Sequence, residues 1–171
     1  MSARYVIDSR GRTHYLLHQE LSKSCGPACV AMAESFYTQS CMVDPEGKAR
    51  QLSQLYPGKF TVAGGTSDMM NLAWVLNAEN VPAYGATAVG PSKIFDYCWY
   101  YTGERTKVIV HIKWSSGGGH FALLKQIDAD HRLIFLDPWY DIVEVPRASL
   151  PNYTIGGASG TLSSFLVITH R

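Results

Sequence analysis

The sequence predicts an α+β fold in which a helical layer comes first and an antiparallel sheet follows. The chain has 171 residues, close to the roughly 150 residues of a typical domain. From Cys25 to about Gly103 the apolar residues recur at helical spacing, whereas after Thr106 short β-rich runs alternate with turn residues. We therefore expect one domain, residues 1–171, in which the helices pack on the sheet.

Four helices are expected in the first half of the chain. The first begins at Cys25 and continues over Gly26–Tyr37, with Pro27 tolerated in its first turn. Two of the other helices begin after residues that can cap a helix, and the last one ends before a glycine that can terminate it. They cover about 45–56 after Asp44, about 69–77 after Thr66 or Ser67, and 92–101 before Gly103.

Five strands are expected in the second half. Ser115–Gly119 forms a turn between the first two strands, and Asp128–Asp130 connects the second to the third. The strands cover 107–114, 120–127, 131–137, 141–145 and 162–169. This order predicts an antiparallel meander.

Charge and hydropathy exclude two classes of function. The 15 Lys and Arg residues and 14 Asp and Glu residues leave a net charge of +1, so the chain lacks the positive field that attracts nucleic acid. Every apolar run is interrupted before it reaches the roughly 18 to 20 residues of a membrane span. Asp8 and Arg10 also interrupt any secretory signal. We expect a cytoplasmic protein, or one secreted by a route that needs no signal peptide.

The cysteines are expected to be free thiols. Cys25, Cys29, Cys41 and Cys98 are irregularly spaced, which does not suit a disulfide framework in a chain able to build its own core. No C-x-x-C pair supports a zinc site. We therefore expect neither a metal nor another cofactor.

Cys25 is the candidate nucleophile because it lies at the start of a helix. The positive end of the helix dipole and the unpaired N–H groups there stabilise a thiolate. Gln19, six positions upstream, can bring its side-chain amide beside the backbone N–H of Cys25. Two such donors would form an oxyanion hole for acyl transfer.

A nucleophilic cysteine also needs a base, and His120 is the candidate. It follows the run Gly117–Gly119 and begins an apolar strand, so its ring is expected at the rim of the sheet. Asp137 ends the next strand, about as far from the Asp128–Asp130 turn as His120 is. We expect the two side chains at the same end of the sheet, with the carboxylate orienting the imidazole.

The order of three motifs resembles that of the papain-like cysteine peptidases. The motifs are Gln19-x5-Cys25-Gly26-Pro27-Ala28, Gly119-His120-Phe121-Ala122-Leu123-Leu124 and Asp137-Pro138-Trp139. The resemblance covers about 19–140 and is nearest to the double-glycine peptidase domains of bacteriocin-exporting ABC transporters and to their stand-alone bacterial relatives. The sequence also resembles, but less closely, the secreted papain-like effectors of bacteria.

This resemblance implies a papain-like fold, with an N-terminal helical layer on a C-terminal antiparallel sheet and an active-site cleft between them. It implies Cys25 as nucleophile, His120 as general base, Asp137 as orienting residue and Gln19 as oxyanion donor. The exporter domains cut leader peptides after a Gly-Gly pair, but this sequence has neither their membrane spans nor their ATPase region.

The predicted function is hydrolysis of a peptide bond in a peptide or protein substrate. The same residues would also serve a cell-wall amidase or a transglutaminase or deamidase, and an inactive peptide-binding module is a further alternative. Each of the proposed catalytic residues could instead have a purely structural role. Cys29, one turn after Cys25, is expected to be structural, and His111 is expected to be a polar residue on one side of a strand.

Overall fold

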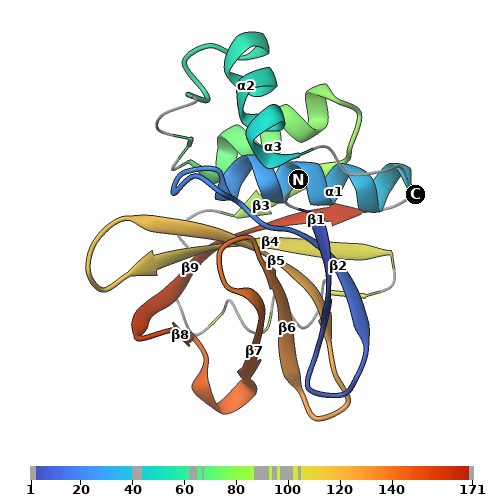
Figure 1. Ribbon diagram of the computed structural model, residues 1–171, viewed down its shortest axis with the longest axis vertical. Helices are drawn as coiled ribbons and strands as arrows, with labels where there is room; N and C mark the ends of the chain where they lie inside the picture. Colours follow the sequence, from blue (N-terminus) through green and yellow to red (C-terminus); the bar gives the residue numbers. More distant parts are fainter. Residues whose placement is uncertain are drawn as a thin grey trace.

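A seven-stranded antiparallel sheet forms the centre of the molecule, and helices cover one of its faces (Figure 1). The computed structural model describes residues 3–39, 44–61, 65–66, 68–86, 102–103 and 105–169, together with positions 93 and 96. Within these residues none of the helices is long and apolar enough to cross a membrane.

The sheet takes strands from the middle and the end of the chain. Its strands are β3 (Ala83–Ala86), β4 (Thr106–Trp114), β5 (Gly119–Ile127), β6 (Arg132–Asp137), β7 (Asp141–Pro146), β8 (Asn152–Ile155) and β9 (Ala158–Thr169). Their order is β3-β9-β4-β5-β6-β7, and β8 also pairs with β9. The expected meander is therefore present from β4 to β7, but the last long strand returns to pair with β4 and lies inside the sheet.

Three α-helices form a small layer on this sheet: α1 (Cys25–Thr38), α2 (Pro45–Leu55) and α3 (Met69–Ala78), and a short 3-10 helix covers Arg147–Ser149. Asp44 caps α2 as expected, accepting hydrogen bonds from the backbone of Glu46 and Gly47. The cap of α3 is Asp68 and not Thr66, while Ser67 lies outside the described residues. The expected helix over 92–101 also lies almost entirely outside them.

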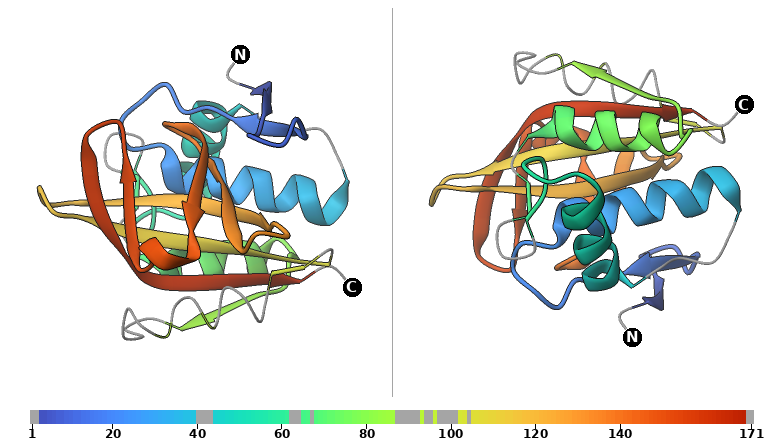
Figure 2. Two further views of the ribbon diagram at one scale, coloured as in Figure 1. Left: turned by 90° about the horizontal axis from the view of Figure 1, so that it is seen from below. Right: turned by 90° about the horizontal axis from the view of Figure 1, so that it is seen from above.

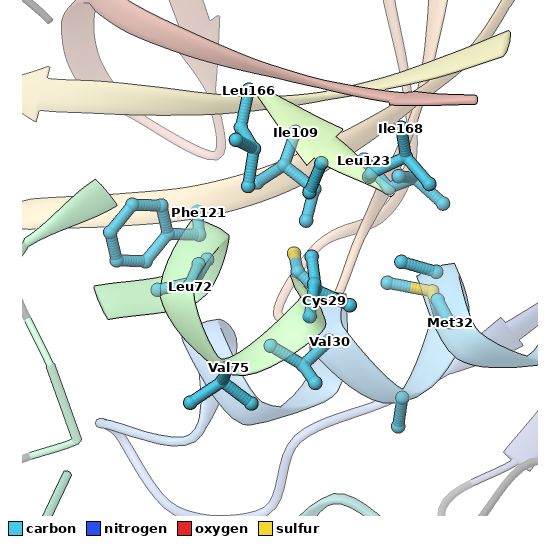
Figure 3. Packing of buried hydrophobic residues seen from close by; sticks show 14 of the residues in the cluster. Cys29, Val30, Met32, Leu72, Val75, Ile109, Phe121, Leu123, Leu166 and Ile168 are labelled. Atoms are coloured by element: carbon cyan, nitrogen blue, oxygen red, sulfur yellow. The ribbon is translucent and has the colours of Figure 1, made fainter. Parts of the chain in front are cut away.

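Helix α1 is the central helix of this layer. It packs on β5, with α2 on its other side, and all of its residues from Cys25 to Ala33 are buried. Figure 3 shows Cys29 and Met32 of α1 facing Ile109 and Leu123 of the sheet. Its start is therefore held firmly against the sheet by apolar packing.

The sheet buries both of its faces. One face packs on α1 and α3. The other encloses a second core made by side chains of β4 to β9, including Phe135, Tyr153 and Phe165. Strand residues alternate between these two environments, so neighbours such as His120 and Phe121 point in opposite directions.

The expected fold class is wrong. The chain begins with a two-stranded hairpin, β1 (Ala3–Ile7) and β2 (Thr13–Leu17), which lies beside α1 (Figure 2). Within the described residues the molecule is mostly antiparallel sheet with a small helical layer, and this arrangement is not clearly papain-like. The helical half also supplies β3 to the sheet, so the division into a helical half and a β half does not hold.

Candidate active site

The thiol of Cys25 lies at the first residue of α1, as the sequence predicts. Its side chain is 7% exposed. The preceding residue, Ser24, makes no side-chain capping hydrogen bond, so its hydroxyl does not occupy the N–H groups at the start of the helix. Gly26 allows this close packing, because a Cβ there would come within 3.3 Å of Thr66 and 3.5 Å of Phe121.

His120 and Asp137 are joined directly. Nε2 of His120 lies 2.8 Å from Oδ1 of Asp137, and the carboxylate is fully buried. The bond links the start of β5 to the end of β6, which is the juxtaposition that the sequence predicts. Because Nε2 is occupied, Nδ1 is the ring nitrogen left for Cys25, a neighbour that helps to raise the pKa of His120.

Asp137 also accepts hydrogen bonds from donors other than His120. Its Oδ1 atom accepts the backbone N–H groups of Trp139 at 2.8 Å and Tyr140 at 3.0 Å. Its Oδ2 atom accepts the hydroxyl of Tyr153 at 2.6 Å. Burial and the charge of Asp137 raise the pKa of Tyr153 well above its usual value, so this hydroxyl stays protonated and donates.

The surroundings of His120 favour its charged form. Burial lowers its pKa, but the hydrogen bond with Asp137 and the neighbouring Cys25 outweigh burial and raise the pKa to about 9. The ring of Trp114 stacks on His120 with the centroids 5.8 Å apart, a position from which an aromatic face stabilises a cation. His120 is therefore an imidazolium at neutral pH, next to a thiol at a helix N-terminus.

Gln19 lies beside these residues and is 1% exposed. Its backbone N–H donates to the carbonyl of Pro138 at 2.7 Å, which fixes it to the turn after Asp137. Its Nε2 atom donates to the carbonyl of Leu21 at 2.7 Å. An amide nitrogen carries two hydrogens, so a second donor remains for an oxyanion.

Glu46 of α2 holds the segment that carries Gln19. One of its carboxylate oxygens accepts the backbone N–H groups of Glu20 at 2.9 Å and Leu21 at 3.2 Å. Neither Glu46 nor Tyr153 was anticipated from the sequence. Their partners are distant in the chain, and no local pattern marks them.

Two adjoining hollows lie on either side of Gly119, and both are lined by this glycine and Ser22. The Cys25 hollow, of about 240 Å³, is also lined by Cys25, Thr66, His111 and Phe121. The His120 hollow, of about 140 Å³, is also lined by Gln19, Trp114, His120 and Trp139. A larger hollow of about 860 Å³ lies between α3 and β3, and its lining includes neither the cysteine nor the histidine.

Cys29 is placed as a core residue. It is fully buried, and burial together with the nearby Cys25 and Asp137 raises the pKa of its thiol well above the usual value. Such a thiol is a poor nucleophile. Cys41 and Cys98 lie outside the described residues. Within the described residues no group of three or more His, Cys, Asp or Glu side chains is arranged to hold a metal ion.

The sequence predicts His111 as a polar residue on one side of a strand. The structure places it on β4, and it also lines the Cys25 hollow. Burial and the neighbouring His120 lower its pKa, so this second histidine is neutral where the first is charged.

A comparison with protein-family models and a search of curated proteins found no match to this chain.

Proposed function

We propose that the protein is a cysteine peptidase that cleaves a peptide bond through an acyl-enzyme on Cys25. The observation that carries this proposal is the hydrogen bond between the ring of His120 and the buried carboxylate of Asp137, with Cys25 at the start of α1 close enough to raise the pKa of that ring. A nucleophile, a base and an orienting group in that order are the requirement for acyl transfer by a thiol. The proposed relationship to papain-like peptidases depends on these residues and not on the fold.

The first half of the proposed reaction forms the acyl-enzyme. The Cys25 thiolate attacks the substrate carbonyl carbon, and a C–S bond forms while the carbonyl oxygen becomes an oxyanion. The backbone N–H of Cys25 and the side-chain amide of Gln19 donate to that oxyanion. His120 then gives its proton to the leaving nitrogen as the C–N bond breaks.

The second half releases the acid. His120, now neutral, removes a proton from water, and the resulting hydroxide attacks the thioester carbonyl. The C–S bond breaks and the thiolate returns, paired again with protonated His120. Asp137 keeps the ring in position throughout, because its own orientation is held by Trp139, Tyr140 and Tyr153.

The hollows suggest how a substrate lies. The leaving nitrogen must be near His120 to receive its proton, so we assign the leaving half of the substrate to the His120 hollow. The acyl half is bonded to Cys25 and belongs in the Cys25 hollow. The substrate is a peptide or protein, and because the nucleophile is a free thiol we infer a reducing compartment such as the cytoplasm.

The proposal is tested with the purified chain and its Cys25→Ala variant on a peptide library, followed by mass spectrometry. We expect cleavage and a transient acyl adduct on Cys25 in the unmodified chain, and a loss of at least about 1000-fold in the variant. Iodoacetamide near pH 6 should label Cys25 much faster than Cys29, Cys41 or Cys98. Undiminished cleavage by the variant contradicts the proposal, as does equal, slow labelling of all four cysteines. Release of ammonia from glutamine without cleavage would instead identify a deamidase.

A further inference from the structure

His111 occupies the acyl side of the proposed active site. It lies on β4 opposite Phe121 of β5, and the centroids of the two rings are 5.0 Å apart. Both residues line the hollow that contains Cys25. The side chain of His120 points to the opposite face of the sheet from those of His111 and Phe121, and it lines the other hollow. The two histidines therefore face different halves of a bound substrate.

A β-bulge orients the ring of His111. The register of β4 with β9 shifts between His111, which pairs with Ser164, and Ile112, which pairs with Leu162. Ser163 is therefore the extra residue of β9, and bulges of this kind commonly redirect side chains next to active sites. Here the bulge brings the hydroxyl of Ser163 to both the ring and the backbone of His111.

We assign the proton of His111 to Nδ1 from the contacts of Ser163, whose hydroxyl lies near both the ring and the backbone of this histidine. The hydroxyl donates its one proton to the backbone carbonyl of His111 at 3.2 Å. It lies 2.7 Å from Nδ1, so at this contact it accepts and Nδ1 donates. Burial and the charge of His120 lower the pKa of His111, so the ring is neutral and Nε2 keeps a lone pair.

Nε2 of His111 lies at the wall of the hollow. A Cβ added at Gly119 would overlap Nε2 of His111, so the nitrogen lies directly against a glycine that lines the hollow. Within the described part of the chain, the hydrogen bonds of the His111 side chain involve Nδ1 and none involves Nε2. An unbonded ring nitrogen of His111 therefore lies at the wall of the hollow that contains the nucleophile.

We infer that His111 is a specificity-determining residue that selects acyl residues with a neutral hydrogen-bond donor, a hydroxyl or a carboxamide, in their side chain. A carboxylate has no donor for Nε2. An ammonium group is disfavoured because Lys23 also lines this hollow and His120 beside it is protonated. A site that offers an acceptor discriminates against an isostere without a donor, since the acceptor is then left unpaired. This inference rests on the proposed function.

The test compares two variants of similar shape, His111→Gln, which can present an oxygen acceptor where Nε2 lies, and His111→Met, which cannot. Peptide pairs carry Thr or Val, and Asn or Leu, at each of the two residues before the scissile bond. We expect the unmodified chain to favour the donor-bearing peptide by about tenfold in kcat/KM at one of these positions. His111→Gln should keep most of this preference, and His111→Met should reduce it to about one.

The same peptides are titrated onto the Cys25→Ala variant, with and without His111→Met, so that selectivity is measured as a ratio of Kd values without turnover. Urea unfolding checks that every variant is folded. An unchanged Thr-to-Val and Asn-to-Leu ratio in His111→Met overturns the inference, and so does the absence of any preference in the unmodified chain. A chain that cleaves nothing but binds donor-bearing peptides selectively through His111 would overturn the proposed peptidase and keep the selectivity.

Discussion

The ionisation of His120 decides whether Cys25 can act as a nucleophile at neutral pH. An isolated imidazole loses its proton near pH 6.5, and burial alone would make it lose the proton at lower pH still. The hydrogen bond to Asp137 and the neighbouring Cys25 reverse that tendency and raise the pKa of His120 to about 9. The fully buried carboxylate of Asp137 thus favours the protonated form of His120, and this positive ring in turn favours the thiolate form of Cys25.

The first prediction at this scale concerns Asp137→Asn. An amide has no negative charge, so the pKa of His120 should fall from about 9 toward its usual value. The limb of kcat/KM that declines as pH rises through this pKa should move to lower pH, and kcat/KM at pH 7 should fall by about 10² to 10⁴-fold. Imidazole NMR measures the pKa directly. Asp141→Asn, which removes a carboxylate paired with Arg4, is the control, and an unchanged His120 titration in Asp137→Asn contradicts the prediction.

Residues with a local signal could be predicted from the sequence. A cysteine before Gly-Pro at a helix start and a histidine after a glycine run are visible in the chain, and Asp137 follows from strand lengths. The structure brings these side chains together, while their catalytic roles stay predictions. Tyr153 and His111 carry no such signal, because one depends on pairing between β8 and β9 and the other on a bulge.

At the scale of elements, the β1–β2 turn and the β5–β6 turn have the same pattern of hydrogen bonds to an aspartate. Asp8 accepts the backbone N–H groups of Arg10 and Arg12, both at 2.9 Å. Asp128 does the same for Asp130 and Arg132, again at 2.9 Å. In each turn the arginine four residues after the aspartate also donates from its side chain. An ion pair between Arg10 and Asp128 then ties the first hairpin to the β5–β6 turn.

The fourth residue of these turns has a left-handed backbone, with φ of 78° at Gly11 and 58° at His131. Gly11→Ala should therefore lower the free energy of unfolding by about 1 to 2 kcal/mol, the cost of placing an L-residue there. A Cβ at Gly11 meets nothing within 4 Å, so this cost comes from the backbone alone. Gly103→Ala is the matched control, since it too has open space but no positive φ. Urea unfolding that shows equal effects at both positions contradicts the explanation.

Long elements were predictable and short ones were not. The helix from Cys25 and the long strands β4 and β5 have enough periodic residues to specify their type. Strands β3 and β8 have four residues each, too few for a pattern. The first turn repeats the D-x-x-x-R spacing of the second, and this repeat is the signal that could have revealed the β1–β2 hairpin.

At the scale of the whole molecule, the fold class depends on pairings that are distant in the sequence. Strand β9 pairs with β3, β4 and β8, and no local pattern shows that the last strand lies inside the sheet. One face of the sheet packs on the helices and the other encloses a second core, so both faces of its long strands are buried. A small helical layer is therefore enough to explain the apolar composition of the second half.

Charged groups buried in both layers predict how the stability of the whole molecule depends on pH. In the helical layer, Lys48 lies 2.6 Å from Glu34 and 2.9 Å from Glu79. Burial and the hydrogen bond to Glu79 raise the pKa of Glu34 from 4.5 to about 8, so its contribution to stability is lost as pH rises through this interval. His120 loses its contribution between 6.5 and about 9. Asp8 and Asp128 have lowered pKa values, because their hydrogen bonds outweigh the effect of burial, and they lose theirs in acid.

The free energy of unfolding should therefore be greatest near pH 4.5, where the aspartates are ionised and Glu34 is still protonated, and fall on both sides. Glu34→Gln keeps the shape of a protonated carboxyl group and cannot ionise. In this variant the decline should start only near pH 6.5, where His120 begins to contribute, and the acid side should be unchanged. Urea unfolding in steps from pH 3 to 9.5 measures both curves. Parallel curves for the variant and the unmodified chain between pH 4.5 and 6.5 would show that the carboxyl group of Glu34 is ionised in the folded protein throughout this range.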